Sequence, residues 1–167
     1  MTLRRLFFFL LIMIIPAFFQ SSAFNMLTVG HIKPDLVLIA ACYIGLHWDE
    51  DTGTCFGFFI GLLQDVFSAG LLGLNALAKT LFGYLSGKAG KRLNIRNPVV
   101  QIFLVALFSL LEGTIFLAAL KIFYLPRDAH ETFLHLVLPQ TLYNIILTPI
   151  LFWLISLIHQ KWILPDE

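Results

Sequence analysis

The stretch LFFFLLIMIIPAFFQSSAFNMLTVGHI, residues 6–32, contains no Asp, Glu, Lys or Arg. A helix of about 20 apolar residues crosses a bilayer, whereas the apolar part of a secretory signal has only about 7–15 residues. Arg4 and Arg5 before this stretch and the small residues 21–23 within it are also typical of a cleaved signal. The length of the charge-free run favours the other interpretation, an uncleaved first membrane helix.

The rest of the chain is also rich in apolar residues and poor in charge. Hydrophobic residues make up 59% of the 167 residues and charged residues 13%, where an average soluble domain has about 25% charged residues. This leaves too little polar surface for a water-soluble globule. At about 20 residues per crossing the chain has room for at most about six or seven helices. We therefore expect residues 1–167 to form a single polytopic membrane domain.

Charges and turn residues divide the apolar sequence into six stretches, which predict an all-α integral membrane protein with a bundle of about six transmembrane helices. The stretches are residues 6–24, 34–48, 53–68, 71–87, 98–124 and 136–158. The second to fourth are shorter than a usual span. They either cross a thinned or partly hydrated region of the membrane or form a re-entrant pair.

The basic residues predict the orientation. Lys and Arg collect in cytoplasmic loops, and Lys88, Lys91, Arg92 and Arg96 form the densest basic cluster of the sequence. With six crossings, a cytoplasmic position for this cluster places the N- and C-termini in the cytoplasm as well.

Small residues recur every four positions in the third predicted helix, at Gly53, Gly57 and Gly61, and Asp65 follows at the same spacing. Residues four apart lie on one face of a helix. Because small residues let membrane helices approach closely, we interpret these glycines as a packing face with an acidic end.

The fourth predicted helix repeats the pattern with Asn75, Lys79, Gly83 and Gly87. Two matching stripes predict close antiparallel packing of the two helices. Asp65 and Lys79 lie at similar distances from the turn that joins the helices, so we expect them to form an ion pair.

Charges inside membrane segments are costly and are usually paired or functional. For Asp65 and Lys79 two interpretations remain, a purely structural pair and a contact with a partner or ligand. Glu112 lies midway along the fifth predicted helix without an evident partner. It either faces Asn144 or Gln140 across the bundle, is protonated, or marks an interaction groove.

The sequence gives little support for catalysis, a cofactor or a metal. No HExxH, Walker, dinucleotide-binding or G-x-S-x-G motif occurs. His130, Glu131 and His135 fall in a predicted periplasmic loop, and Cys42 and Cys55 fall in predicted hydrophobic helices. The net charge of +1 and the apolar setting of the aromatic residues argue against nucleic-acid binding. We expect a protein that is not an enzyme.

Between residues 33 and 93 four motifs follow one another: Pro-Asp at the start of a hydrophobic helix, a glycine-spaced helix ending in Leu-x-Asp, a Gly-Leu-Asn-Ala turn and a basic loop. They are Pro34 and Asp35, then Gly57 and Gly61 with Asp65, then residues 73–76 with Asn75, then residues 88–92. In this order and in a chain of this length, the motifs resemble the rod shape-determining protein MreD family.

The resemblance implies a non-catalytic scaffold of the bacterial elongation machinery in the inner membrane, which inserts lateral peptidoglycan and maintains rod shape. MreC would be its main partner, beside MreB, RodA, the elongation transpeptidase and membrane lipid. It also implies a helical arrangement similar to the membrane S-component of energy-coupling-factor transporters.

That similarity supplies an alternative function, a small-molecule-binding membrane subunit of a vitamin-type transporter. Such a site needs several convergent polar groups, whereas only Asp35, Asp65, Asn75 and Lys79 gather near the outer side of the predicted topology. The small number of clustered polar residues favours the scaffold.

Overall fold

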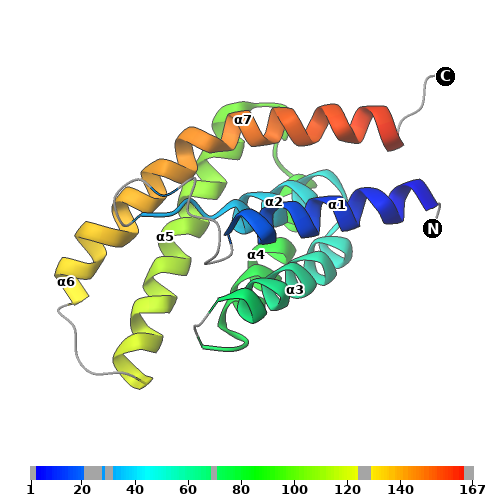
Figure 1. Ribbon diagram of the computed structural model, residues 1–167. Helices are drawn as coiled ribbons and strands as arrows, with labels where there is room; N and C mark the ends of the chain where they lie inside the picture. Colours follow the sequence, from blue (N-terminus) through cyan, green and yellow to red (C-terminus); the bar gives the residue numbers. More distant parts are fainter. Residues whose placement is uncertain (1–2, 21–27, 29–31, 69–70, 124–128, 164–167) are drawn as a thin grey trace.

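The computed structural model describes residues 3–20, 28, 32–68, 71–123 and 129–163. The elements of these residues are all helices (Figure 1): α1 (Leu3–Gln20), α2 (Leu36–His47), α3 (Glu50–Phe67), α4 (Leu74–Gly90), α5 (Pro98–Phe123), α6 (Ala129–Thr132), the π-helical turn η1 (Phe133–Val137) and α7 (Leu138–Ile163). The predicted ends of the first and fifth helices, at residues 24 and 124, and residues 21–23 of the signal-like sequence lie outside the described residues.

Helix α2 forms the centre of the bundle. All its residues from Leu36 to Leu46 are buried, as expected for a helix that is hydrophobic on every side. Its 12 residues extend only about 18 Å at 1.5 Å per residue. It is therefore much shorter than the roughly 30 Å hydrocarbon core of a bilayer, and neighbouring helices cover it from several directions (Figure 1).

Helices α3 and α4 pack backbone to backbone, which confirms the close packing predicted from the glycine stripes. A Cβ atom at Gly61 would lie 2.6 Å from the carbonyl oxygen of Asn75, and one at Gly57 would overlap the carbonyl oxygen of Lys79. Gly53 and Gly83 approach each other in the same way. The stripe therefore serves packing inside the chain along its whole length.

The starts of α3 and α4 each differ by three residues from the predicted ones because of a local cap. Helix α3 begins at Glu50, three residues early, because the carboxylate of Asp49 accepts a hydrogen bond from the backbone N–H of Thr52 at 2.7 Å. Helix α4 begins at Leu74, three residues late, because Gly73 has a φ of 94°. A left-handed residue of this kind stands outside the helix.

The last helix is longer than predicted. Helices α6, η1 and α7 follow one another without a break, so His130, Glu131 and His135 lie in helix and their prediction as loop residues is wrong. The physical reason is tertiary: Val137 is buried and packs onto Gly113 of α5, where a Cβ would overlap its side chain. Packing against α5 supports helix beyond the purely apolar stretch.

Three helical stretches are long and apolar enough to cross a membrane, within the described residues: Leu3–Gln20, Pro98–Phe123 and His130–Lys161. With α2, α3 and α4 they make six helices when α6, η1 and α7 are counted as one. The chain is a helical membrane protein. The similarity of its helical arrangement to transporter S-components stays a prediction.

The helices form two unequal parts. Helices α1, α3 and α4 pack around α2. Helices α5 and α7 form an antiparallel pair, and the far end of this pair, with α6, projects beyond the other helices (Figure 1). The start of α1 and the end of α7 lie at the same end of the molecule.

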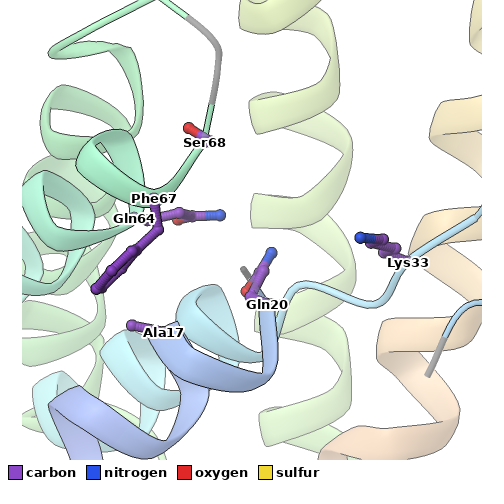
Figure 2. Close-up of a pocket in the computed structure, with 6 residues that line it drawn as sticks. All are labelled: Ala17, Gln20, Lys33, Gln64, Phe67 and Ser68. Atoms are coloured by element: carbon purple, nitrogen blue, oxygen red, sulfur yellow. The ribbon is translucent and has the colours of Figure 1, made fainter. Parts of the chain in front are cut away.

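A pocket of about 160 Å³ lies between the last turns of α1 and α3; we call it the α1–α3 pocket (Figure 2). Its lining residues are Ala17, Gln20, Lys33, Gln64, Phe67 and Ser68.

Candidate functional site

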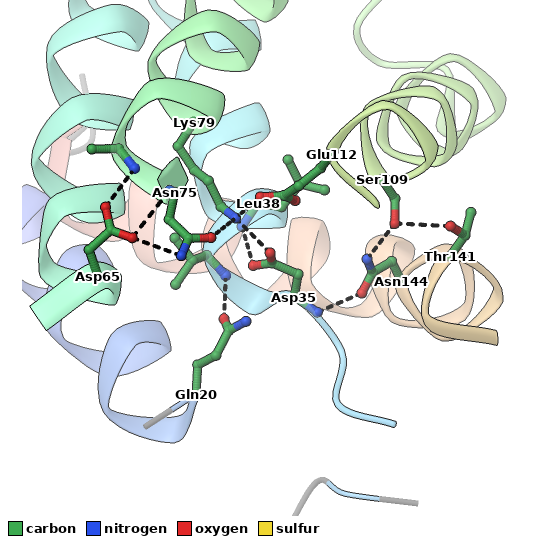
Figure 3. A network of polar contacts seen from close by, with 12 residues as sticks. Gln20, Asp35, Leu38, Asp65, Asn75, Lys79, Ser109, Glu112, Thr141 and Asn144 are labelled. Atoms are coloured by element: carbon green, nitrogen blue, oxygen red, sulfur yellow. Dashed lines mark hydrogen bonds and ion pairs between the residues drawn. The ribbon is translucent and has the colours of Figure 1, made fainter. Parts of the chain in front are cut away.

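The sequence-predicted site residues Asp35, Asn75, Lys79 and Glu112 meet in a buried ionic cluster (Figure 3). The Nζ atom of Lys79 donates to Asp35 Oδ2 at 2.7 Å, to Asn75 Oδ1 at 3.3 Å and to Glu112 Oε1. An ammonium group has three hydrogen-bond donors, and all of them are used here. Lys79 has no solvent-exposed surface, and Asp35 is 4% exposed.

Asp35 holds its position because it caps α2. Its Oδ1 atom accepts from the backbone N–H of Leu38 at 2.8 Å, while Oδ2 binds Lys79. A helix N-terminus carries unpaired N–H groups and a partial positive charge, so a carboxylate there is stabilised from two sides. The local sequence Pro34-Asp35 therefore directs one oxygen into the helix and the other toward α4.

The cluster extends to α7 through buried polar side chains (Figure 3). The backbone N–H of Asp35 donates to Asn144 Oδ1 at 2.7 Å, and Asn144 Nδ2 donates to Ser109 Oγ at 2.9 Å. Ser109 Oγ also lies 3.2 Å from Thr141 Oγ1. The network thus connects α2, α5 and α7 by interhelical hydrogen bonds.

The hydrogen bond between Asn144 and Asp35 was not predicted, although the sequence carries a signal for an interhelical contact of Asn144. Thr141, Asn144 and Thr148 are spaced on one face of α7 and are all buried. A polar stripe on an otherwise apolar membrane helix indicates an interhelical contact.

The predicted ion pair between Asp65 and Lys79 is wrong. The Asp65 carboxylate instead caps α4: Oδ2 accepts from the backbone N–H groups of Gly73 at 2.9 Å and Ala76 at 3.0 Å, and Oδ1 accepts from Asn75 Nδ2 at 2.9 Å. Asn75 is the link between the two residues, because its Oδ1 accepts from Lys79.

The reason for this difference is the rotation of α4. The backbone of Lys79 faces α3, since a Cβ at Gly57 would overlap its carbonyl oxygen. The side chain must then leave α4 on another side, toward α2 and α5. Asp65 lies opposite the free N–H groups at the start of α4, where a carboxylate is strongly favoured.

Glu112 points from α5 to Lys79 and not to Asn144 or Gln140, the partners considered from the sequence. Its hydrogen bond to the ammonium group ties α5 to α4, and the 2.7 Å pair of Lys79 with Asp35 ties α4 to α2. One cation therefore joins three helices.

The opposite end of α3 and α4 carries a second, exposed ionic contact. Lys91 Nζ lies 2.5 Å from Glu50 Oε2, and this hydrogen bond raises the pKa of Lys91. The pKa of Asp49 is lowered because its carboxylate accepts the backbone N–H of Thr52. Exposed pairs of this kind contribute little stability, so this end differs from the buried cluster.

The hydrogen bonds of Lys79 in the buried cluster all go to side chains of this chain. The donors and acceptors of the cluster are bonded to one another, and within the part of the chain that the structure describes no group of three or more His, Cys, Asp or Glu is placed to hold a metal ion. The two cysteines, Cys42 and Cys55, are free.

Comparisons with known proteins bear on the identity of this bundle. Neither the curated proteins nor the solved structures gave a match. A family model described as rod shape-determining protein MreD matches residues 2–162, a range that contains the whole buried ionic cluster. Because the match covers nearly all 167 residues, the chain belongs to the rod shape-determining protein MreD family.

Proposed function

We propose that this chain is a non-catalytic scaffold of the bacterial cell-elongation machinery in the inner membrane, where it binds MreC and supports lateral peptidoglycan synthesis. MreB, RodA and the elongation transpeptidase are further expected partners. The family match supports a role in rod shape. The observation that carries the scaffold proposal is that the intramembrane polar groups bind one another inside the bundle, whereas large apolar side chains are exposed on its surface.

The intramembrane charges are used inside the chain. Lys79 donates to Asp35 at the start of α2, to Glu112 of α5 and to Asn75 of its own helix. The Asp65 carboxylate accepts the N–H groups at the start of α4. A transporter subunit would need such groups to converge on a small molecule. The four polar residues near the predicted outer side, Asp35, Asp65, Asn75 and Lys79, are bonded within the bundle, which favours the scaffold.

The apolar surface, by contrast, is large and faces outward. On α5 and α7, Phe103, Phe116, Ile146 and Trp153 are all exposed. Helices in a bilayer associate by close packing and a few hydrogen bonds rather than by hydrophobic burial. We therefore place the contact with MreC on the projecting α5–α7 pair.

A photocrosslinking amino acid at single positions in living cells tests this proposal. We expect MreC adducts from at least one of Phe103, Phe116, Ile146 and Trp153. The same amino acid at the buried Phe108 of α5 is the matched control and should give none. Absence of MreC adducts from all exposed positions at normal protein levels, with normal rod growth after depletion, would contradict the scaffold.

A further inference from the structure

The α1–α3 pocket is lined by hydrogen-bond donors. Lys33 supplies an ammonium group, Gln20 and Gln64 supply amides and Ser68 a hydroxyl, while none of the six lining residues has a carboxylate. The nitrogen atoms of Lys33, Gln20 and Gln64 point toward the space between them (Figure 2). Such a set suits a ligand with several acceptor oxygens and a negative charge.

The carboxylates nearest in sequence are turned away from the pocket. Asp35, two residues after Lys33, binds Lys79 and caps α2. Asp65, next to Gln64, caps α4. Among the described residues Lys33 consequently has no ion-pair partner, so its positive charge is available to a ligand.

The orientation of the Gln20 amide is determined by the fold. Its Oε1 atom accepts the backbone N–H of Val37 at 3.2 Å, which occupies the acceptor side of the amide. The NH2 group is therefore the side that is directed into the pocket (Figure 2).

Gln64 contributes a further donor to the pocket through its side-chain NH2 group (Figure 2). Its side chain lines the pocket although the residue is only 9% exposed, and its Oε1 atom is buried without a hydrogen-bond partner in the described structure. Phosphate oxygens are acceptors and cannot pair with this Oε1 atom, so a ligand that satisfies it must also carry a hydroxyl donor, as the glycerol headgroup of phosphatidylglycerol does. Packing alone would be served better by Leu.

We propose that the α1–α3 pocket binds the phosphate group of an anionic phospholipid. A lysine ammonium beside amide and hydroxyl donors matches phosphate oxygens. The lipid source is favoured over free phosphate because Phe67, which lines the pocket, and its neighbour Val66 are 45% and 65% exposed. This apolar surface lies where acyl chains attached to a bound headgroup would run.

The test uses the purified full-length chain in detergent and follows its thermal unfolding during titration with phosphatidylglycerol. Three ligands are compared: phosphatidylglycerol, diacylglycerol with the same acyl chains, and inorganic phosphate. We expect phosphatidylglycerol to raise the unfolding temperature and diacylglycerol to have little effect. Lys33→Met and Gln64→Leu should each weaken binding about tenfold, as for loss of one hydrogen bond to a charged group.

Lys88→Met is the matched control, since Lys88 is an exposed lysine at the other end of α4, and it should bind like the unchanged chain. A Lys33-dependent shift with inorganic phosphate equal to that with the lipid would assign the same site to a free anion. Equal stabilisation by diacylglycerol, or unchanged lipid binding in both folded pocket variants, would overturn the proposal.

Discussion

Lys79 is the residue on which the polar interior of this bundle depends. It is fully buried and donates to side chains of α2, α4 and α5. Removing one partner of a buried ion pair leaves an uncompensated charge and costs about 3–5 kcal/mol. We expect Lys79→Met to lower the free energy of unfolding, measured in mixed micelles, by about that amount, and to reduce protein abundance in cells.

Two comparisons make this prediction specific. Lys88→Met, at an exposed lysine of the same helix, should change stability by less than about 0.5 kcal/mol. Glu112→Gln should be milder than Lys79→Met, because Asp35 still pairs with Lys79 and the glutamine oxygen still accepts a hydrogen bond. Equal stability losses for the two lysine variants would show that the cluster does not stabilise the fold.

Asp65 acts on the backbone of α4 rather than on a charge. It accepts the N–H groups of Gly73 and Ala76, which are free at a helix start. Loss of an N-terminal cap typically costs about 1–2 kcal/mol. We expect Asp65→Ala to lower the free energy of unfolding by about 2 kcal/mol and to speed hydrogen exchange of these two amides, with the Ser86 amide as the internal reference. Unchanged exchange at the start of α4 would contradict the capping role.

At the scale of the element, backbone contact between α3 and α4 leaves no space for larger side chains at their interface. A methyl group at Gly57 would overlap the carbonyl oxygen of Lys79, and a helix backbone cannot yield as a side chain can. Overpacking costs about 1–3 kcal/mol, so we expect Gly57→Ala to lose about 3 kcal/mol of unfolding free energy. Phe59→Leu, at an exposed position of the same helix, is the control and should change stability by less than about 0.5 kcal/mol.

Asp49, the cap at the start of α3, predicts that the stability of the fold depends on pH. The folded pKa of Asp49 lies below its ordinary value of 3.8 because Thr52 N–H binds the carboxylate. A lowered folded pKa contributes stability that is complete above the unfolded pKa and is lost as the pH falls through the folded one. Unfolding measurements below about pH 4 should show this loss.

Two variants separate the cap from the titration. Asp49→Asn should remove this acid-side decline while keeping an oxygen that accepts the Thr52 N–H, because asparagine is an equally good cap. Asp49→Ala should remove both and cost about 1 kcal/mol at neutral pH. An unaltered decline in the asparagine variant would assign the pH dependence to another group.

For the whole molecule, the prediction concerns orientation. The start of α1 and the end of α7 lie at one end of the bundle (Figure 1), and the basic segment with Lys88, Lys91, Arg92 and Arg96 favours the cytoplasm. We expect alkaline phosphatase fused at Arg96 or Glu167 to be inactive and green fluorescent protein fused there to be bright. Phosphatase activity at either fusion point would reverse the proposed orientation.

The sequence alone determined the features that depend on local composition and period. Charge-free apolar runs predict membrane helices, because a bilayer excludes charge over a length of about 20 residues. The glycines at every fourth position predicted the contact between α3 and α4, because they lie on one helix face and only small residues allow such an approach. The order of the short motifs also resembled the family that the comparison then showed.

Only the tertiary structure decided which charges meet. The partners of Lys79 lie 44 residues away at Asp35 and 33 residues away at Glu112, while Asp65, nearer in sequence, binds the backbone of α4. Spacing along a helix predicts depth and shared faces. It does not predict how far α4 is rotated about its axis or which helices lie beside it, because these follow from the packing of all the helices around α2.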